Sequence, residues 1–332
     1  MNSESRKRRG RPSLEDLLLL LDEEVGLAYA RLGGLPRAVE ADLVLRQVWI
    51  DDVHNSTAIE GNTLTRVQVE RIIETRMVAG QASLSESLDV EGYARAADWV
   101  YRNAGEHKGV PVRIVSEIHR LALGLVWEVE PPPTRDRPGA WRLGGVRLGA
   151  VKVSLPSAIL ADLTEWSRST AAVEHHPVVH AAIHHAWFGR IHPFVDGNGR
   201  VGRLIMNFML LQAGYPPAVI PVADRRRYLR AIQATDRGNV GTLSALVARS
   251  ARQTLTRFLI PNLAGRAKLV PLSALAEVGP YSSAYLRQLA ISGRLRTVRE
   301  GRPYLSSKAW LDDYIRTRDP RGGQPGGRRS RG

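Results

Sequence analysis

The sequence contains no cysteine among its 332 residues. Disulfide frameworks, thiolate metal sites and catalytic thiols are therefore excluded. Long apolar runs are also absent, since the longest is residues 17–21, with acidic residues on both sides. A membrane-spanning helix needs about 20 predominantly apolar residues, and the basic start of the chain lacks a clean apolar signal segment. We expect a soluble, cytoplasmic protein with no membrane partner.

Acidic residues are scarce relative to basic ones. Lysine and arginine number 47 against 33 aspartates and glutamates, so the formal net charge is +14 and the pI is near 10.6. Such an excess favours polyanionic partners, either nucleic acid or nucleotide phosphates. A general bias towards arginine is the alternative, but it does not explain why the charge concentrates at both ends of the chain.

Most of the chain has helical rather than alternating apolar spacing. The predicted helical segments are residues 13–33, 37–55, 64–99, 111–124, 156–170, 176–191, 200–212, 224–236 and 240–260. Residues 131–153 differ, because proline and glycine punctuate short Val/Leu pieces, and they predict a β-hairpin.

The length suggests about two domains, and Pro261 opens a segment with the composition of a linker. The predicted order is a basic disordered tail (1–12), an N-terminal helical region (13–110), a core (111–262), a linker (263–269), a C-terminal module (270–318) and a second basic disordered tail (319–332).

Residues 192–203 read HPFVDGNGRVGR and lie between two predicted helices. Gly197 and Gly199 let the backbone bend and approach a ligand, and the free N–H groups of the following helix point into the same turn. A phosphate binds naturally at such a helix N-terminus. Arg200 and Arg203 are three residues apart, so we expect both to reach that anion from one side and to neutralise a triphosphate.

Two further side chains of this segment supply chemistry. Asp196 is a hard oxygen ligand beside the phosphate site, which suits a Mg²⁺ ion that also takes phosphate oxygens. His192 titrates near neutrality and is placed to accept the proton of an attacking hydroxyl. Singly, such residues are usually structural, but eight fixed positions would arise together in roughly one of 10¹⁰ windows at ordinary composition.

The segment resembles the signature HPF-x-[D/E]-G-N-G-R-x-x-R of the Fic family, and every fixed position matches. The resemblance covers approximately residues 50–260. It implies an α-helical Fic core and protein AMPylation, in which AMP passes from Mg-ATP to a hydroxyl side chain of a target protein. It also implies that His192 is the base and that Asp196 holds Mg²⁺. The resemblance further implies that the phosphates of ATP are bound by Gly197, Asn198, Gly199, Arg200 and Arg203. Of these, Arg203 is implied to bind the γ-phosphate.

Residues 56–62 read STAIEGN and resemble the inhibitory motif of the same family, [S/T]-x-x-x-E-[G/N]. Ser56 and Glu60 are one helical turn apart, so they share a face. We expect Glu60 to pair with Arg203 and to occupy the cation that should hold the γ-phosphate. An ordinary helix end is the structural alternative. The same carboxylate could instead align a water that removes AMP, as in some family members.

Two other features are interpreted through the resemblance. Residues 139–153 look like the family's flap, whose edge can add a strand of the target chain, although a plain surface hairpin would have the same pattern. Tyr228 resembles a family position near the adenine. The neighbouring histidines 175, 176, 180, 184 and 185 lack the acidic partner that would complete a known zinc pattern, and we interpret them as structural.

Residues 270–318 predict a helix, a turn, a helix, a β-wing and a last helix, which resembles a winged helix-turn-helix module. Such a module lays its second helix in the major groove. Arg287, Gln288 and Arg294 would then contact DNA, while a protein-docking module is the alternative. Residues 9–12 read RGRP and resemble an AT-hook core, for which a nonspecific basic tail is the alternative.

Taken together, the sequence predicts a mainly α fold: a Fic-type helical core with a β-hairpin flap, and a small winged helix-turn-helix domain. The predicted activity is ATP- and Mg²⁺-dependent AMP transfer to an unknown target protein, the chain itself included, restrained by Glu60. A DNA-binding regulator whose core only senses nucleotide is the second hypothesis, and removal of AMP by the same site is the third. His192 favours an enzyme, because sensing needs no base. A homodimer is left open.

Overall fold

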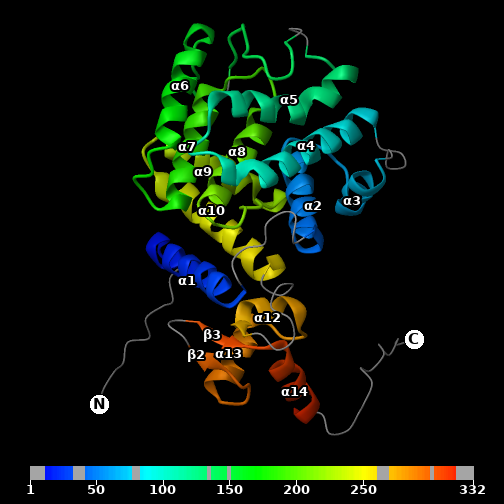
Figure 1. Cartoon of the computed structure of the whole chain (residues 1–332), viewed down its shortest axis with the longest axis vertical. Helices are drawn as coiled ribbons and strands as arrows, with labels where there is room; N and C mark the ends of the chain where they lie inside the picture. The colour runs from blue at the N-terminus through cyan, green and yellow to red at the C-terminus, as the bar shows by residue number, and fades with distance from the viewer. Residues whose placement is uncertain are drawn as a thin grey trace, which may run out of the picture.

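A computed structural model describes residues 12–32, 42–76, 83–132, 136–147, 151–259, 269–299 and 303–318. Within these ranges the chain is mostly helical (Figure 1). The helices before the active-site segment are α1 (Leu14–Leu32), α2 (Asp42–Ile59), α3 (Arg66–Thr75), α4 (Leu84–Asn103), η1 (Ala104–Glu106), α5 (Val112–Val129), η2 (Pro156–Ala158), α6 (Ile159–Thr170) and α7 (Pro177–Ile191). Those after it are α8 (Asn198–Gln212), η3 (Val222–Asp224), α9 (Arg225–Thr235), α10 (Val240–Thr254) and the π-helical turn η4 (Leu255–Leu259).

The predicted helices are confirmed within the described residues, which exclude 33, 37–41, 77–82 and 260 of the predicted ranges. One useful difference concerns α2. This helix runs on to Ile59 instead of ending near residue 55. Ser56 therefore lies within the helix, and Glu60 is the first residue after it. None of the helices in the described ranges is long and apolar enough to cross a membrane.

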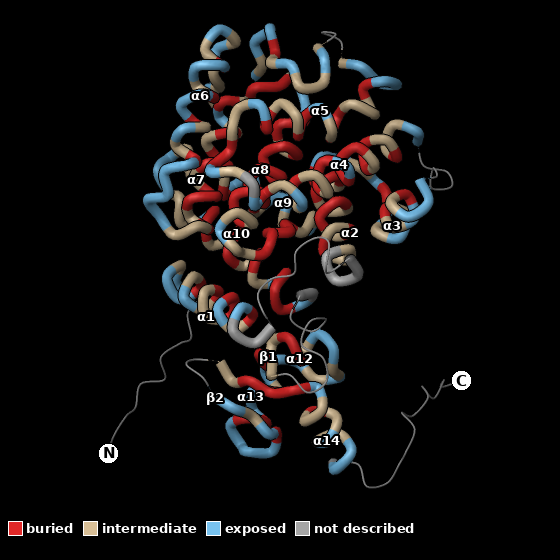
Figure 2. Tube along the Cα trace, in the orientation of Figure 1, coloured by how far each residue is buried: buried red, intermediate tan, exposed pale blue. Residues whose placement is uncertain are grey.

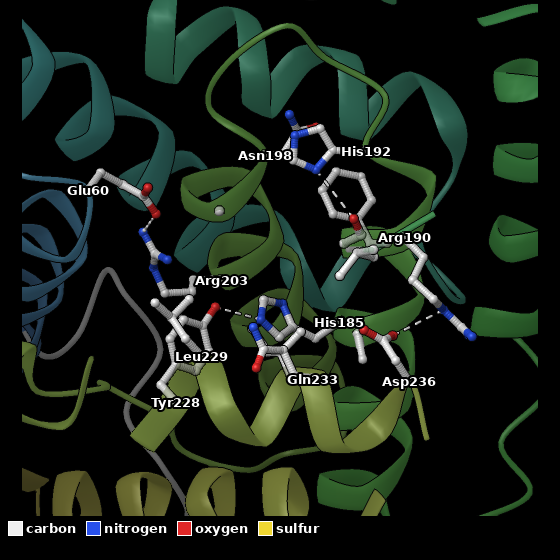
Figure 3. A pocket seen from close by; sticks show the side chains of 16 residues that line it. Glu60, His185, Arg190, His192, Asn198, Arg203, Tyr228, Leu229, Gln233 and Asp236 are labelled. Carbon is white, nitrogen blue, oxygen red and sulfur yellow. Dashed lines mark hydrogen bonds and ion pairs between the residues drawn. The ribbon is translucent and has the colours of Figure 1, made fainter. Parts of the chain in front are cut away.

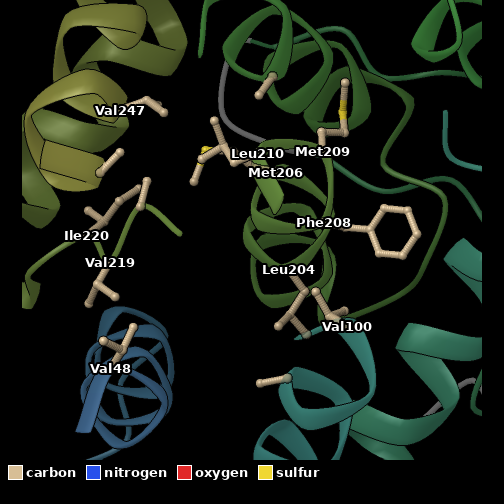
Figure 4. Packing of buried hydrophobic residues seen from close by; sticks show 14 of the residues in the cluster. Val48, Val100, Leu204, Met206, Phe208, Met209, Leu210, Val219, Ile220 and Val247 are labelled. Atoms are coloured by element: carbon tan, nitrogen blue, oxygen red, sulfur yellow. The ribbon is translucent and has the colours of Figure 1, made fainter. Parts of the chain in front are cut away.

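Helix α8 is the centre of the core, as its apolar spacing predicts. Val201, Leu204, Ile205 and Phe208 are fully buried on it, and the helix is surrounded by other elements in Figure 2. Helices α7, α4 and α5 pack against it, and Figure 4 shows Leu204 and Phe208 projecting from it in different directions. Because each buried side chain of this size contributes roughly 1.5–3 kcal/mol, α8 is a rigid base for the turn at its start.

The turn after α2 is fixed to its neighbours by polar side chains. Asn62 donates from Nδ2 to the Glu86 carbonyl at 3.0 Å and to Asp89 Oδ2 at 3.2 Å, both on α4. Thr65 and Gln68 then form a reciprocal capping box that starts α3, a contact that satisfies backbone donors at a helix start. The segment that carries Glu60 is thus held from both sides.

The tip of the β-hairpin predicted over residues 139–153 lies outside the described residues, at 148–150, and Val151 directly after it forms an isolated β-bridge. Two backbone donors beside it bond outside the segment. The Arg142 N–H donates to the Pro193 carbonyl at 2.9 Å, and the Ser154 N–H donates to the Arg190 carbonyl at 3.2 Å. The segment, called the flap segment below, is therefore fastened to the active-site loop.

The C-terminal module has the predicted order of a helix, a helix, a hairpin and a helix, with one strand more. Its elements are β1 (Val270–Pro271), α12 (Leu272–Val278), α13 (Ser283–Ile291), β2 (Val298–Arg299), β3 (Tyr304–Ser306) and α14 (Lys308–Arg318). The strands form an antiparallel sheet in the order β1-β3-β2, with Val270 opposite Ser306 and Val298 opposite Leu305. Helix α12 packs against η4. The predicted linker, both tails and residues 9–12 lie outside the described residues, apart from 12 and 269.

Candidate active site

The site begins at the turn between α7 and α8. His192 ends α7 in the left-handed conformation, with φ 49°, and its N–H donates to the Phe188 carbonyl at 3.0 Å. Gly197 precedes α8 with φ 80°, and a Cβ there would lie 2.7 Å from the Leu123 side chain. Only glycine tolerates both that conformation and that approach. The first N–H groups of α8 are consequently left free of intrahelical partners and face the turn.

Asn198 shapes this turn with its side chain. Its Oδ1 accepts from the Phe194 N–H at 3.0 Å, and its Nδ2 donates to the Phe194 carbonyl at 2.8 Å. The Phe194 ring is fully buried. Since the Asn198 amide is used in closing the loop, the group that Asn198 can offer an anion is its backbone N–H at the start of α8.

A cavity of about 400 Å³ lies against this turn, within the range of 300–1,000 Å³ that is usual for ligand sites. Helices α7, α8 and α9 line it, together with Glu60 directly after α2 and Val151 of residues 139–153, and Figure 3 shows the labelled side chains around it. The predicted site residues that line it are Glu60, His192, Asn198, Gly199, Arg203 and Tyr228. The sequence thus places most of its candidate residues around one cavity.

His192 faces this cavity as a neutral base. Burial, with a smaller contribution from the charge of Arg142, lowers the pKa of its imidazole below 6.5, although the Gly189 carbonyl, Asp196 and Glu60 oppose the shift. Its Nδ1 lies 3.3 Å from the Gly189 carbonyl oxygen. Because a carbonyl only accepts, this contact places the proton on Nδ1. Nε2 then keeps a free lone pair, as a general base requires.

Arg203 is held by the residues of the inhibitory motif. Its Nε donates to Ser56 Oγ at 2.8 Å, and its Nη2 donates to the Ser56 carbonyl at 2.9 Å and to Glu60 Oε1 at 2.8 Å. The predicted contact between Glu60 and Arg203 is therefore present. Burial alone lowers the pKa of Arg203, but Tyr228 and Glu60 outweigh it and the net shift is upward. The guanidinium is a permanent cation at the cavity wall.

Glu60 also occupies space beside the turn. A Cβ on Gly199 would collide with the Glu60 carboxylate, so that carboxylate rests directly on the first turn of α8. An anion there is favoured by the dipole of the helix. Glu60 therefore occupies a position that suits a phosphate, and it also pairs with the cation, Arg203, that could bind one.

Arg200 does not join Arg203 on the cavity side, contrary to the sequence-based expectation. It is almost fully buried and pairs with Asp89 of α4, while its Nη2 donates to Asp196 Oδ2 at 2.7 Å. Asp89 was missed because nothing in its local sequence marks it, although it is a buried carboxylate on an otherwise apolar helix face. Arg200 is thereby committed to holding the loop.

Asp196 is the one predicted metal ligand, and its carboxylate is 61% exposed beside the start of α8. Within the described ranges there is no cluster of three or more His, Cys, Asp or Glu side chains that could hold a metal. A single exposed carboxylate is a donor suited to Mg²⁺, which is commonly bound by one or two carboxylates together with substrate phosphates.

The far end of the cavity is built by α9. The Tyr228 hydroxyl lies 2.7 Å from Nε2 of His185, and burial lowers the pKa of His185 to about 4, so that imidazole stays neutral. Leu229 and Gln233 of α9 and Asp236 directly after it also line the cavity. The sequence analysis does not single these out, although their spacing of four and three residues would place them on one side of a helix.

The predicted DNA-contacting residues lie apart from this cavity. Arg287, Gln288 and Arg294 are exposed on and after α13. Residues 283–299 contain four arginines and no carboxylate. Of these arginines, Arg296 packs its guanidinium 4.4 Å from the ring centroid of Trp310. DNA binding by this face stays a prediction.

Comparison with known proteins agrees with the geometry of the site. Residues 110–210 match the Fic/DOC family. The protein therefore carries a Fic/DOC family domain, and the active-site segment lies within it.

Among curated relatives, a Protein adenylyltransferase Fic from Drosophila virilis is 32% identical over 78% of this chain and 53% of its own length, and one from Drosophila mojavensis is 31% identical over 78% and 51%. The chain thus spans about half the length of these relatives. Among solved structures, Fic-1 (aa134 - 508) from C. elegans is 26% identical with a TM-score of 0.63, covering 74% of this chain and 71% of that one.

A second structural match is a Fic domain containing signaling protein from Bacteroides thetaiotaomicron. It is 23% identical with a TM-score of 0.60, covering 72% of this chain and 96% of that one. At this identity the match supports the fold alone.

Proposed function

We propose that this protein transfers AMP from Mg-ATP to a hydroxyl side chain of a target protein. The observation that carries the proposal is that the neutral imidazole of His192, the start of α8 at Gly199 and the cation of Arg203 line one cavity. The name shared by the curated relatives, protein adenylyltransferase, supports it.

The reaction follows from these positions. The free N–H groups at the start of α8 bind the phosphates of ATP, and Arg203 holds the γ-phosphate. Nε2 of His192 takes the proton of the hydroxyl, whose oxygen attacks the α-phosphorus. The bond from that phosphorus to the oxygen bridging the α- and β-phosphates breaks, and pyrophosphate leaves. A Mg²⁺ ion held by Asp196 and phosphate oxygens would neutralise the charge that develops.

The same geometry makes the protein self-inhibited. Glu60 holds Nη2 of Arg203 and rests on Gly199, so the γ-phosphate has to displace a carboxylate before the triphosphate can adopt the productive pose. Removal of AMP remains a second use of this carboxylate, because it lies beside the phosphate site and could align a water there.

The test incubates wild type, Glu60→Gly and His192→Ala with α-labelled ATP and cell lysate. Label should enter protein in Glu60→Gly, enter less in wild type and be absent in His192→Ala. Persistent labelling by His192→Ala would overturn the assignment of the base. No labelling by Glu60→Gly at any Mg-ATP concentration would overturn the activity.

We propose, as a second and separate function, that the C-terminal module binds duplex DNA. The observation favouring it is the separation of charge: residues 283–299 hold four arginines and no carboxylate, Glu300 follows them directly, and the other acidic residues of the module, Glu277, Asp312 and Asp313, lie on α12 and α14. An exposed helix with Arg287 and Gln288 on one face can contact phosphates and base edges.

A further inference from the structure

Arg142, in the flap segment, is 2% exposed although it carries a charge. Its guanidinium donates to three carbonyl oxygens: from Nε to His192 at 2.7 Å, from Nη1 to Gly144 at 2.8 Å and from Nη2 to Ser154 at 2.5 Å. Its own backbone N–H donates to the Pro193 carbonyl at 2.9 Å. One residue therefore contacts both arms of the flap segment and two consecutive carbonyls of the active-site loop.

The partners of this arginine are unusual. In the part of the chain that the structure describes, no ion pair joins the Arg142 guanidinium to a carboxylate, and burial lowers its pKa. Removing an ion from water costs several kcal/mol unless a counter-charge or a full set of hydrogen bonds offsets it. Carbonyl oxygens can supply the bonds but not the counter-charge. A neutral side chain would fill the same space without this cost. We therefore look for a role of the charge and of the three N–H donors that the planar guanidinium presents, called the donor fork below.

The backbone of His192 shows what the donor fork does. A non-glycine residue in the left-handed conformation costs roughly 1–2 kcal/mol and persists only where its surroundings hold it. The N–H of His192 is held by Phe188, and its carbonyl is held by Arg142. The adjoining Pro193 carbonyl is held by the backbone of the same arginine. The direction of the imidazole thus depends on contacts from the flap segment.

The flap arms are in turn anchored to the rest of the fold. Ser154 accepts from Arg142 with its carbonyl, donates its N–H to Arg190 at 3.2 Å and donates its hydroxyl to Asp162 of α6 at 2.5 Å. The Arg142 guanidinium is therefore linked to α6 and to the end of α7 through Ser154, and it contacts the active-site loop directly at the His192 carbonyl.

We propose that Arg142 is the positioning residue for the catalytic base, fixing the left-handed backbone of His192 and coupling the direction of its imidazole to the flap segment. This rests on the proposed AMP transfer for the role of His192 as base. The positive charge of Arg142 acts in the same direction, because together with burial it keeps His192 unprotonated against Asp196 and Glu60.

Three substitutions separate the parts of this role. Arg142→Lys keeps the charge but replaces the donor fork by a single ammonium that cannot reach all three carbonyls. Arg142→Met removes both. The matched control is Arg147→Met, a change at an exposed arginine of the same segment. All are made in the Glu60→Gly background, so that inhibition does not hide the effect.

Kinetics gives the first measurement. Arg142→Met should lower kcat about 100-fold, the loss expected when a reacting group is displaced by roughly 1 Å, while KM for ATP changes less than about 3-fold because the phosphates bind to α8 and Arg203. Arg142→Lys should fall between Arg142→Met and the parent in kcat. Arg147→Met should match the parent. A wild-type kcat in Arg142→Lys and Arg142→Met, or equal changes in kcat and KM, would overturn the proposal.

A second measurement needs no activity. The imidazole of His192 is followed by nitrogen NMR in the full-length chain without nucleotide, its signal identified by its loss in His192→Gln. Arg142→Met should raise the pKa of His192 and abolish the preference for the proton on Nδ1, and Arg142→Lys should abolish the preference while leaving the pKa low. Unchanged signals in both variants would overturn the proposal even if transfer is never observed. If Arg142→Met does not fold, Arg142→Lys decides both measurements.

Discussion

Nη2 of Arg203 and Oε1 of Glu60 are joined at 2.8 Å, with the guanidinium buried and the carboxylate at the edge of the cavity. The two residues lie 143 positions apart in the sequence. Helix α2 brings Glu60 to this place through Ser56, one turn earlier, which holds the same arginine by its hydroxyl and its carbonyl. For the proposed AMP transfer, this contact makes the inhibited and the active state depend on which anion Nη2 binds.

Glu60→Gly should raise the rate of self-modification with Mg-ATP by about 10- to 100-fold, since a hydrogen bond to a charged group contributes roughly 1.5–3 kcal/mol. Glu60→Gln, which can still accept from Arg203 but carries no charge, should give a smaller rise. Glu74→Gln, at a partly exposed carboxylate of α3, is the control. Labelling rates with α-labelled ATP measure all three, and a Glu60→Gly rate equal to wild type would show that inhibition lies elsewhere.

The acidic limb of the pH profile should lie below the ordinary histidine value of 6.5, because the pKa of His192 is lowered. The base acts only when unprotonated, so kcat should fall as the pH drops through that lowered pKa and should be flat from there to neutrality. The measurement is kcat for Glu60→Gly between pH 4.5 and 8. A limb centred above 6.5 would contradict the neutral base in the cavity.

The buried carboxylate of Asp52, on which Arg203 acts, should make the stability of the fold depend on pH. Burial raises the pKa of Asp52 to about 6, although Tyr101, Arg203 and Asn207 oppose the shift. An acid whose folded pKa is raised stabilises the fold below its unfolded pKa of 3.8, and this contribution is lost as the pH rises through about 6.

Asp52→Asn should therefore gain stability relative to wild type as the pH rises from 4 to 8, by about 1–3 kcal/mol, since one pKa unit corresponds to roughly 1.4 kcal/mol. Thermal unfolding at several pH values measures the difference. The control is Asp98→Asn on the surface of α4. Its difference in unfolding free energy from wild type should not rise between pH 4 and 8. If the difference in unfolding free energy between Asp52→Asn and wild type stays constant with pH, the pKa of Asp52 is the same in the folded and the unfolded protein, and the prediction is wrong.

Binding of duplex DNA by the C-terminal module should weaken steeply between 50 and 200 mM salt, because each phosphate contact releases counterions. Arg287→Ala and Arg294→Ala should each lower the affinity and reduce the slope against salt by about one contact. Arg316→Ala, at an exposed arginine of α14, is the matched control. Fluorescence anisotropy with full-length protein decides: no binding at 50 mM salt, or equal effects of all three substitutions, would leave protein docking as the use of this face.

The sequence predicts the parts of the site that depend on local geometry. Gly197, with its positive φ, fixes the tight turn before α8, and the spacing of Ser56 and Glu60 places them on one side of α2. Both predictions are independent of the rest of the fold. The pairing with Arg203 follows from the resemblance, because no local rule relates residues so far apart.

The parts that could not be predicted depend on distant partners. Arg200 lies in the first turn of α8, as the sequence suggests, but Asp89, 111 residues away, pairs with its guanidinium. Arg142 looks like a surface arginine until the three carbonyls around it are known.

Ser56 accepts two hydrogen bonds from Arg203 that do not involve Glu60. These bonds bear on how the proposed inhibition would be relieved. When the Glu60 carboxylate moves away, one N–H of Arg203 Nη2 becomes free. The hydrogen bonds between Arg203 and Ser56 of α2 remain, and α8 does not move. Activation then requires no rearrangement of the helices and amounts to competition between two anions for one donor. An enzyme built this way should respond to ATP in a graded, hyperbolic manner, without a threshold.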